Sequence, residues 1–313
     1  MPTATAPAPI DASTAALAAC PVGVVPIVWN NADLADLAPF VPVDTVLDEI
    51  ARLGYAGCQT GVGFPTGPEL RAALRGRGLR LAEVYATLPL RADGPGEDAL
   101  ELGRERLAIL REAGGEVLVA AGDLAPEREA WAGRASDARA PRLSDDGLRR
   151  FAAVVDALAR EALAGGQRLA FHPHAGTFVE TPDEVQRFAA ATDPDATGFC
   201  LDVGHYTVGG GDAVAAVREL GDRVTHVHLK DVAREPLVRL RAGETGGFLG
   251  ALRDRVFTEL GSGILDLDGV LRALAWNGYT GWLMIEQDTT WRPPSESAAI
   301  GRAVLAYAAG RAG

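Results

Sequence analysis

The chain has 313 residues, 48% of them hydrophobic, which is enough to bury one large core or two smaller ones. Its net charge of −12 argues against a nucleic-acid partner, because phosphate binding needs clustered Lys and Arg. No apolar run approaches the roughly 18 residues of a membrane span, so no membrane partner is expected. Three widely spaced cysteines give no disulfide framework, which favours a cytoplasmic protein.

The beginning of the chain differs in composition from the rest. Residues 1–20 are rich in Ala, Pro and Thr and lack the basic region that opens a signal peptide. We expect a flexible N-terminal tail there and a catalytic domain over residues 21–313.

From about residue 22 onward, short apolar runs typical of strands alternate with segments of helical period. The expected strands are 23–29, 56–60, 79–84, 117–121, 168–172, 198–202, 224–228 and 281–286. Eight such units in a chain of this length predict a single-domain (β/α)8 TIM barrel. The alternative is an open, doubly wound sheet, which the absence of G-x-G-x-x-G after the first strand disfavours.

Two connections are longer than the others. One covers residues 123–142, and the other is a loop insertion at about 232–263. Both follow the carboxyl ends of expected strands, where the active sites of barrels form. Long loops at this end often act as lids, and a surface insertion without a role is the alternative for the first of them.

All five histidines lie between residues 172 and 228, in three short clusters at the ends of expected strands. The clusters are His172-Pro-His174, Asp202-Val-Gly-His205 and His226-Val-His228-Leu-Lys230-Asp231, and Lys230 is the only lysine. Side chains alternate along a strand, so His226, His228 and Lys230 should point to one side. Taken singly, each histidine could be a hydrogen-bonded core residue.

Carboxylates accompany these histidines. Asp202 ends an otherwise apolar run, and Glu286 ends the last expected strand. A buried carboxylate is costly unless it is paired or bound to a metal, although Asp202 could cap a turn and Glu286 could pair with an arginine. Four successive strands with such groups at one end predict a divalent metal site. A mixed His and carboxylate set suits Mn²⁺, Co²⁺, Zn²⁺ or Fe²⁺ better than Mg²⁺.

Four motifs carry a resemblance to a known family. They are His172-Pro-His-Ala-Gly-Thr177, Leu201-Asp-Val-Gly-His205, His226-Val-His-Leu-Lys-Asp231 and Gly281-Trp-Leu-Met-Ile-Glu-Gln-Asp288. Over roughly residues 22–310 the chain resembles the xylose-isomerase-like superfamily of sugar isomerases and epimerases, and within it the inosose dehydratase branch.

The resemblance implies one metal ion, most simply Mn²⁺ or Co²⁺, held by four side chains. These would be His172, Asp202, His228 and Glu286. His stands at 172 where the superfamily usually has Glu, so His174 or Glu180 could also complete the set. Gln59 stands where the dehydratase branch commonly has Glu, which leaves the substrate open.

Such a metal site would stabilise an enediolate formed from a small keto-polyol such as 2-keto-myo-inositol. His174 and His205 are the candidate bases, and Lys230 would offer positive charge or a proton. The substrate contacts are expected from Trp29, Asn30, Gln59 and Asp288, with a rim aromatic and a turn as the alternative for the first two. His226 is expected to lie beneath the metal, and Glu83 and Tyr85 are weaker candidates.

The leading hypothesis is a metal-dependent lyase, a dehydratase of a keto-cyclitol or a related keto-sugar. A ketose isomerase or 3-epimerase is the alternative, as is elimination on a 3-keto-glycoside, because the same ligands support each outcome. A DNA-repair endonuclease of the superfamily is disfavoured by the acidic charge and by the lack of any His before 172. A non-catalytic barrel would require that no metal binds. A homo-oligomer is left open.

Overall fold

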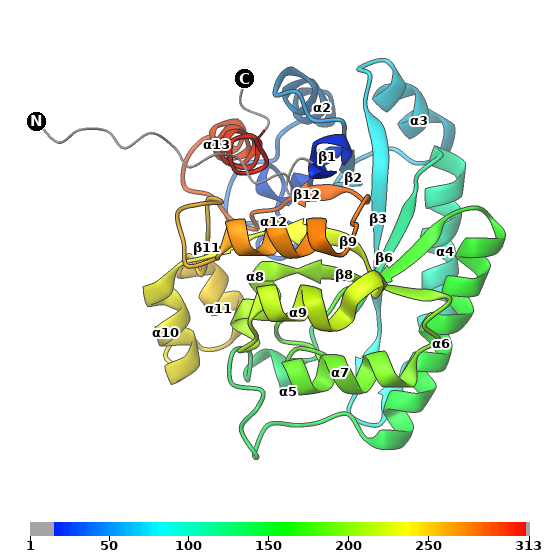
Figure 1. Cartoon of the computed structure of the whole chain (residues 1–313), viewed down its shortest axis with the longest axis vertical. Coiled ribbons are helices and arrows are strands. Elements are labelled where there is room, and N and C mark those ends of the chain that lie inside the picture. Colours follow the sequence, from blue (N-terminus) through cyan, green and yellow to red (C-terminus); the bar gives the residue numbers. More distant parts are fainter. Residues whose placement is uncertain (1–15, 311–313) are drawn as a thin grey trace, which may run out of the picture.

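Eight parallel strands close into a barrel in the order β1-β12-β9-β8-β7-β6-β3-β2 (Figure 1). The computed structural model describes residues 16–310. The strands are β1 Val22–Val24, β2 Gly57–Gln59, β3 Arg80–Leu88, β6 Val117–Gly122, β7 Arg168–Phe171, β8 Thr197–Asp202, β9 Val224–Leu229 and β12 Leu283–Ile285. The predicted TIM barrel is confirmed, and the closure between β1 and β12 excludes an open sheet.

The helices cover the outside of this barrel (Figure 1). They are α2 Val43–Arg52, α3 Gly67–Arg75, α4 Ala99–Ala113, α6 Asp145–Ala164, α7 Pro182–Ala191, α8 Val203–Val208, α9 Ala213–Leu220, α12 Leu267–Trp276 and α13 Pro294–Ala308. Between the strands and helices lies a core in which the rings of Phe151, Phe171 and Phe188 contact one another in edge-to-face and tilted arrangements. Local signals place some helix starts, since Ser144 caps α6 and Thr181 forms a capping box with Glu184 on α7.

The first strand is shorter than predicted. The expected strand over 23–29 ends at Val24, and Pro26–Val28 forms a 3-10 helix, η2. Proline has no backbone N–H and a fixed φ, so Pro26 favours a turn over a continued strand pairing. This change of direction decides where Trp29 lies.

The two long connections contain regular structure. The first holds the short helix α5 Pro126–Glu129. The second holds α10 Arg234–Ala242 and α11 Phe248–Arg253, which lie between the two strands of a small antiparallel sheet, β10 Asp231–Val232 and β11 Phe257–Thr258. Leu237, Leu240, Phe248 and Leu252 form a hydrophobic cluster separate from the main core, together with residues of other loops such as Ala132 and Ala175, so the segment packs on these loops as a cap. A hairpin joins β4 Leu90–Arg91 to β5 Gly94–Pro95.

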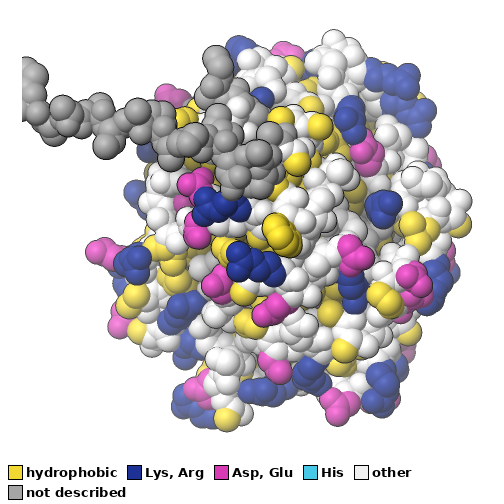
Figure 2. All heavy atoms as spheres, viewed as in Figure 1, with side chains coloured by type: hydrophobic (Ala, Val, Ile, Leu, Met, Phe, Trp, Pro, Cys, Tyr) yellow, Lys and Arg dark blue, Asp and Glu magenta, His cyan; other side chains and the backbone are white. Residues whose placement is uncertain are grey.

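The expected N-terminal tail falls mostly outside the described residues, which begin at 16. Its last part, Ala16–Ala19, forms the 3-10 helix η1, and Leu17 is buried in the main core. Among the described residues, we find no helix with the length and apolar character that crossing a membrane requires. The face drawn in Figure 2 mixes acidic and basic side chains and shows no histidine.

Candidate metal centre and active site

Four side chains from four neighbouring strands meet at the carboxyl end of the barrel. His172 follows β7, Asp202 ends β8, His228 lies in β9 and Glu286 follows β12. Each offers one ligand atom, and these four atoms lie within 4.8 Å of one another. Strands β7, β8, β9 and β12 are adjacent and parallel, so their carboxyl ends necessarily share this place. The structure thus brings together the four residues that the resemblance implied.

Three ligand atoms of this cluster make no hydrogen bond within the described residues, although Lys230 Nζ lies 3.2 Å from Asp202 Oδ2. Asp202 Oδ2, His228 Nδ1 and Glu286 Oε2 are buried, and among the described residues none has a hydrogen-bond partner. His228 Nδ1 lies 2.7 Å from Glu286 Oε2 and 3.8 Å from Asp202 Oδ2. A buried polar atom without a hydrogen bond generally costs about 1–3 kcal/mol, and a shared cation would satisfy these three atoms together. The residues therefore fit a divalent ion that accepts both nitrogen and oxygen ligands.

A carboxylate from the opposite side of the barrel supports the metal cluster. Glu83 in β3 is fully buried, and both of its oxygens lie 3.1 Å from Nε2 of His228. It also contacts Nε2 of His226. Burial raises the pKa of Glu83, but the two histidines outweigh that effect and hold it below its ordinary value. A carboxylate on the far nitrogen orients a ligand histidine, which leaves Nδ1 of His228 for the ion.

The lysine lies directly beside the proposed ion. Lys230 Nζ is 2.6 Å from Asp288 Oδ1, 3.2 Å from Asp202 Oδ2 and 3.2 Å from Glu286 Oε1. Burial alone would lower the pKa of Lys230, but the neighbouring carboxylates outweigh it and raise the pKa well above its ordinary value. The ring of Phe257, in the cap, covers the ammonium, with its centroid 4.7 Å from Nζ of Lys230, so this charge is enclosed in the site.

Two stacked imidazoles complete the polar group. The rings of His174 and His205 lie 3.7 Å apart between centroids, and Nε2 of His205 is 2.9 Å from Nζ of Lys230. Burial is the main reason why the pKa of each ring lies well below its ordinary value. Both rings are therefore neutral near pH 7, as proton acceptors must be.

A cavity of about 390 Å³ reaches part of this polar group. Its lining includes His172, His174, Glu286, Gln59 and Asp288, whereas Asp202, His205, His228 and Lys230 are not among its lining residues. This volume suits a small polyol rather than a polymer.

Further residues line the same cavity. Asn30 does so, but its side-chain amide bonds the backbone of Val41 in both directions, so it holds a loop in place. Asp33 and Arg106 also line the cavity, although no motif in the sequence pointed to them. Tyr85, a weaker candidate, lies here too.

One expected substrate contact, Trp29, lies apart from the cavity, and one open alternative for the metal shell, Glu180, lies apart from the ligand cluster. Trp29 is absent from the cavity lining, because its indole nitrogen donates to Glu49 at 2.6 Å and its ring packs in the main core. The turn at Pro26 directs it away from the barrel mouth. Glu180 lies outside the cluster of four ligand atoms, and its two oxygens accept hydrogen bonds from the amides of Gly133 and Gly176. Burial raises the pKa of Glu180 to about 7, against those two donors.

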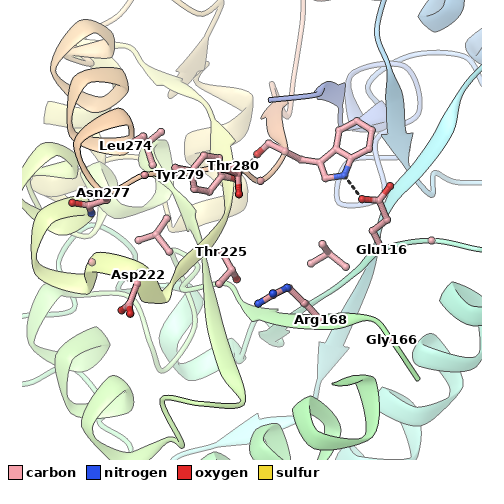
Figure 3. Close-up of a pocket in the computed structure, with 16 residues that line it drawn as sticks. Glu116, Gly166, Arg168, Asp222, Thr225, Leu274, Asn277, Tyr279 and Thr280 are labelled. Carbon is pink, nitrogen blue, oxygen red and sulfur yellow. Dashed lines mark hydrogen bonds between the residues drawn. The ribbon is translucent and has the colours of Figure 1, made fainter. Parts of the chain in front are cut away.

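A second cavity, of about 470 Å³, lies at the amino end of the barrel (Figure 3). It is lined by the starts of several strands and includes Glu116, Arg168, Asp222 and Thr225. Trp282 donates a hydrogen bond of 3.0 Å to Glu116, drawn as the dashed line in Figure 3. None of the histidines lines this cavity, so the cluster of histidines and carboxylates lies apart from it, at the opposite end of the barrel.

The fold and the convergent polar site define a TIM-barrel protein with a small-molecule site at its carboxyl end. Residues 47–307 match the family of xylose isomerase-like TIM barrels. The chain belongs to this family, which confirms the resemblance seen in its motifs.

Individual relatives cover nearly the whole chain. It is 32% identical over 295 residues to the rhizopine catabolism protein MocC of Rhizobium meliloti, covering 93% of this chain and 89% of that protein. It is 31% identical over 284 residues to the inosose dehydratase of Salmonella typhimurium, covering 90% and 93% of the two chains. The solved structure of an L-ribulose 3-epimerase matches with a TM-score of 0.68 at 17% identity, covering 93% and 95%, and shares the fold. The chain is thus a TIM-barrel enzyme of the sugar dehydratase and isomerase type.

Proposed function

We propose that this protein is a divalent-metal-dependent dehydratase of a keto-cyclitol such as 2-keto-myo-inositol. One observation carries the proposal: His172, Asp202, His228 and Glu286 converge beside a buried lysine and two neutral imidazoles. Relatives named inosose dehydratase, about 30% identical over most of the chain, support the lyase assignment.

The reaction needs charge stabilisation at a carbonyl oxygen. A divalent cation held by the four ligands would supply Lewis-acid polarisation of the substrate's carbonyl. The ammonium of Lys230 lies within 3.2 Å of two of these ligands, Asp202 and Glu286, and adds positive charge where negative charge develops on the substrate. Phe257 and the rest of the cap limit water around it, which strengthens this interaction.

Dehydration also needs a base for the α-proton and an acid for the departing hydroxyl. His174 lines the cavity and is neutral, and its Nδ1 bonds the Ala175 carbonyl oxygen at 2.8 Å, which leaves Nε2 to accept the proton. Lys230 carries protons and contacts both His205 and Asp288, so this group can donate one to the leaving oxygen. If no hydroxyl departs, return of the proton to the neighbouring carbon gives isomerisation, and its return to the same carbon from the opposite face gives epimerisation.

The test begins with chelator-treated protein that is reloaded separately with Mn²⁺, Co²⁺, Zn²⁺, Fe²⁺ or Mg²⁺. Each form is incubated with 2-keto-myo-inositol, a 3-keto-glycoside and a panel of small ketoses, and the products are identified by mass and NMR. Metal-dependent loss of water from the inosose, with absorbance from a conjugated dione, supports the proposal. Sugar isomers without loss of water indicate the epimerase alternative, release of an aglycone indicates glycoside elimination, and either product in place of the dione overturns the dehydratase assignment.

A further inference from the structure

In the turn that follows β7, a single residue, Ala175, hydrogen-bonds to both stacked imidazoles, those of His174 and His205. The carbonyl oxygen of Ala175 accepts a hydrogen bond of 2.8 Å from Nδ1 of His174. The amide of Ala175 donates to Nδ1 of His205 over 3.3 Å. A carbonyl oxygen can only accept, so Nδ1 of His174 carries the ring proton and its Nε2 holds a free electron pair.

The peptide group between Ala175 and Gly176 is held from its other side by a buried carboxylate. Gly176 N–H donates to Glu180 Oε2 at 2.7 Å, and Gly133 N–H donates to Glu180 Oε1 at 2.7 Å. Glu180 is 1% exposed, and the Arg128 guanidinium lies 4.0 Å away. Arg128 is itself fully buried and paired with Glu184 at 2.8 Å. The carboxylate is therefore fixed on both sides.

The turn also has little freedom of its own. Gly176 has a φ of +82°, which side chains other than glycine rarely adopt, and a Cβ there would meet Leu124 at 3.1 Å and Phe248 at 3.3 Å. The N–H of Gly176 and the carbonyl of Ala175 belong to one planar trans peptide, so they point in opposite directions. When Glu180 fixes the N–H, it fixes the direction of the carbonyl as well.

We infer that Glu180 is a positioning residue that acts through the Ala175–Gly176 peptide to hold His174 as its Nδ1–H tautomer, with Nε2 free to take a proton. The carboxylate also polarises this peptide, which makes its carbonyl a better acceptor for the ring proton. The kinetic consequence rests on the proposed function, because it assumes that His174 is the base. The tautomer itself is a property of the protein without substrate.

The tautomer can be measured directly, because the chain has only five histidines to resolve by 15N NMR. In metal-free protein at a pH where the rings are neutral, we expect His174 to show a protonated Nδ1 and an unprotonated Nε2. Glu180→Met removes both acceptor oxygens and should give a mixed or reversed tautomer at His174. Glu180→Gln can still accept from Gly176 through its amide oxygen and should largely restore the wild-type signal.

A matched control is available on the neighbouring loop. Glu129 accepts a hydrogen bond of 2.8 Å from the amide of Leu249 and makes no hydrogen bond to the turn, so Glu129→Met should leave the His174 signal unchanged. In turnover, Glu180→Met should lower kcat by about 10–100-fold with KM and metal content little changed, as for other residues that orient a reacting group. Glu180→Gln should recover most of kcat.

Several results would overturn the inference. The inference fails if His174 of the wild-type protein is protonated at Nε2, or if the Glu180→Met protein keeps the wild-type tautomer. It also fails if Glu129→Met changes the His174 signals as much as Glu180→Met does. If Glu180→Met does not fold, the wild-type spectrum and the Glu180→Gln protein decide. Failure of the proposed function looks different, because the wild-type protein would then not dehydrate the inosose while the tautomer result stands.

Discussion

The two ends of the barrel differ in the burial of their charged side chains, which are buried at the carboxyl end and largely exposed at the amino end. At the carboxyl end, Lys230 is buried with Asp202 and Asp288, and several ligand-type atoms have no hydrogen-bond partner among the described residues. At the amino end, Glu116 pairs with Arg80, and their side chains are 41% and 54% exposed. Trp282 satisfies the second oxygen of Glu116. Water screens the pair at the amino end, whereas the buried group gains its stability from mutual pairing and from a ligand.

This contrast shows that the charged groups unfavourable for folding are concentrated at the carboxyl end of the barrel. A buried group of charges with unpaired atoms is unfavourable for folding alone, and proteins retain such groups where a bound ion or a reaction uses them. The cavity at the amino end is larger, yet its charged residues lie at the surface and none of its lining residues belongs to the metal cluster. We therefore base the proposed active site on the buried ligand atoms that lack hydrogen bonds and not on the size of a cavity.

The largest effect is expected from His228→Ala. This change removes a ligand nitrogen from the centre of the cluster, so the protein should lose its metal and at least ~10³-fold in activity. We expect it to remain folded, because the barrel closes through backbone pairing of β9 with β8 and β12. Metal analysis, circular dichroism and turnover check this. A metal-loaded, fully active His228→Ala protein would remove this residue from the site.

Lys230→Met should have the next largest effect. The carboxylates of Asp202 and Glu286 keep their places as metal ligands, so metal content should be retained. Turnover should fall about 10²–10⁴-fold, because the proton donor and the nearby positive charge are lost. Steady-state kinetics on metal-saturated protein measure this. Unchanged turnover would show that the ammonium takes no part in the reaction.

Glu83→Gln tests the support beneath the metal. The amide cannot hold the far nitrogens of His226 and His228 as the carboxylate does, so metal affinity should weaken about 10–100-fold. Saturating metal should restore much of the activity. Competition with a chelator of known affinity measures the change. An affinity equal to that of the wild type would limit Glu83 to packing.

The smallest effect is expected at the amino end. Glu116→Gln breaks a half-exposed pair with Arg80, which should lower the free energy of unfolding by no more than about 1 kcal/mol. Activity and metal content should equal those of the wild type. Chemical denaturation and turnover provide the comparison. A large loss of activity would mean that the two ends are coupled, and the contrast drawn between them would fail.

Much of the fold could be predicted because it depends on short-range patterns. The alternation of apolar runs with helical periods located all eight barrel strands, since each strand is buried on both faces and reads as a continuous apolar run. The first strand was predicted to be too long because buried residues continue past Val24. The effect of Pro26 on strand pairing is not visible in the hydrophobic pattern. The helices of the cap were missed as elements because short polar segments carry a weak periodic signal.

The sequence by itself determined which residue types stand at the carboxyl ends of the last four strands. That His, Asp and Glu residues stand at these strand ends follows from local patterns, and the family resemblance singled out His172, Asp202, His228 and Glu286 among them. Only the tertiary structure decided the partners that lie across the barrel or in other loops: Glu83 beneath His228, Trp29 against Glu49, and Glu180 behind the turn of His174. These contacts join residues far apart in the chain or depend on the path of a loop, and spacing along the sequence contains neither.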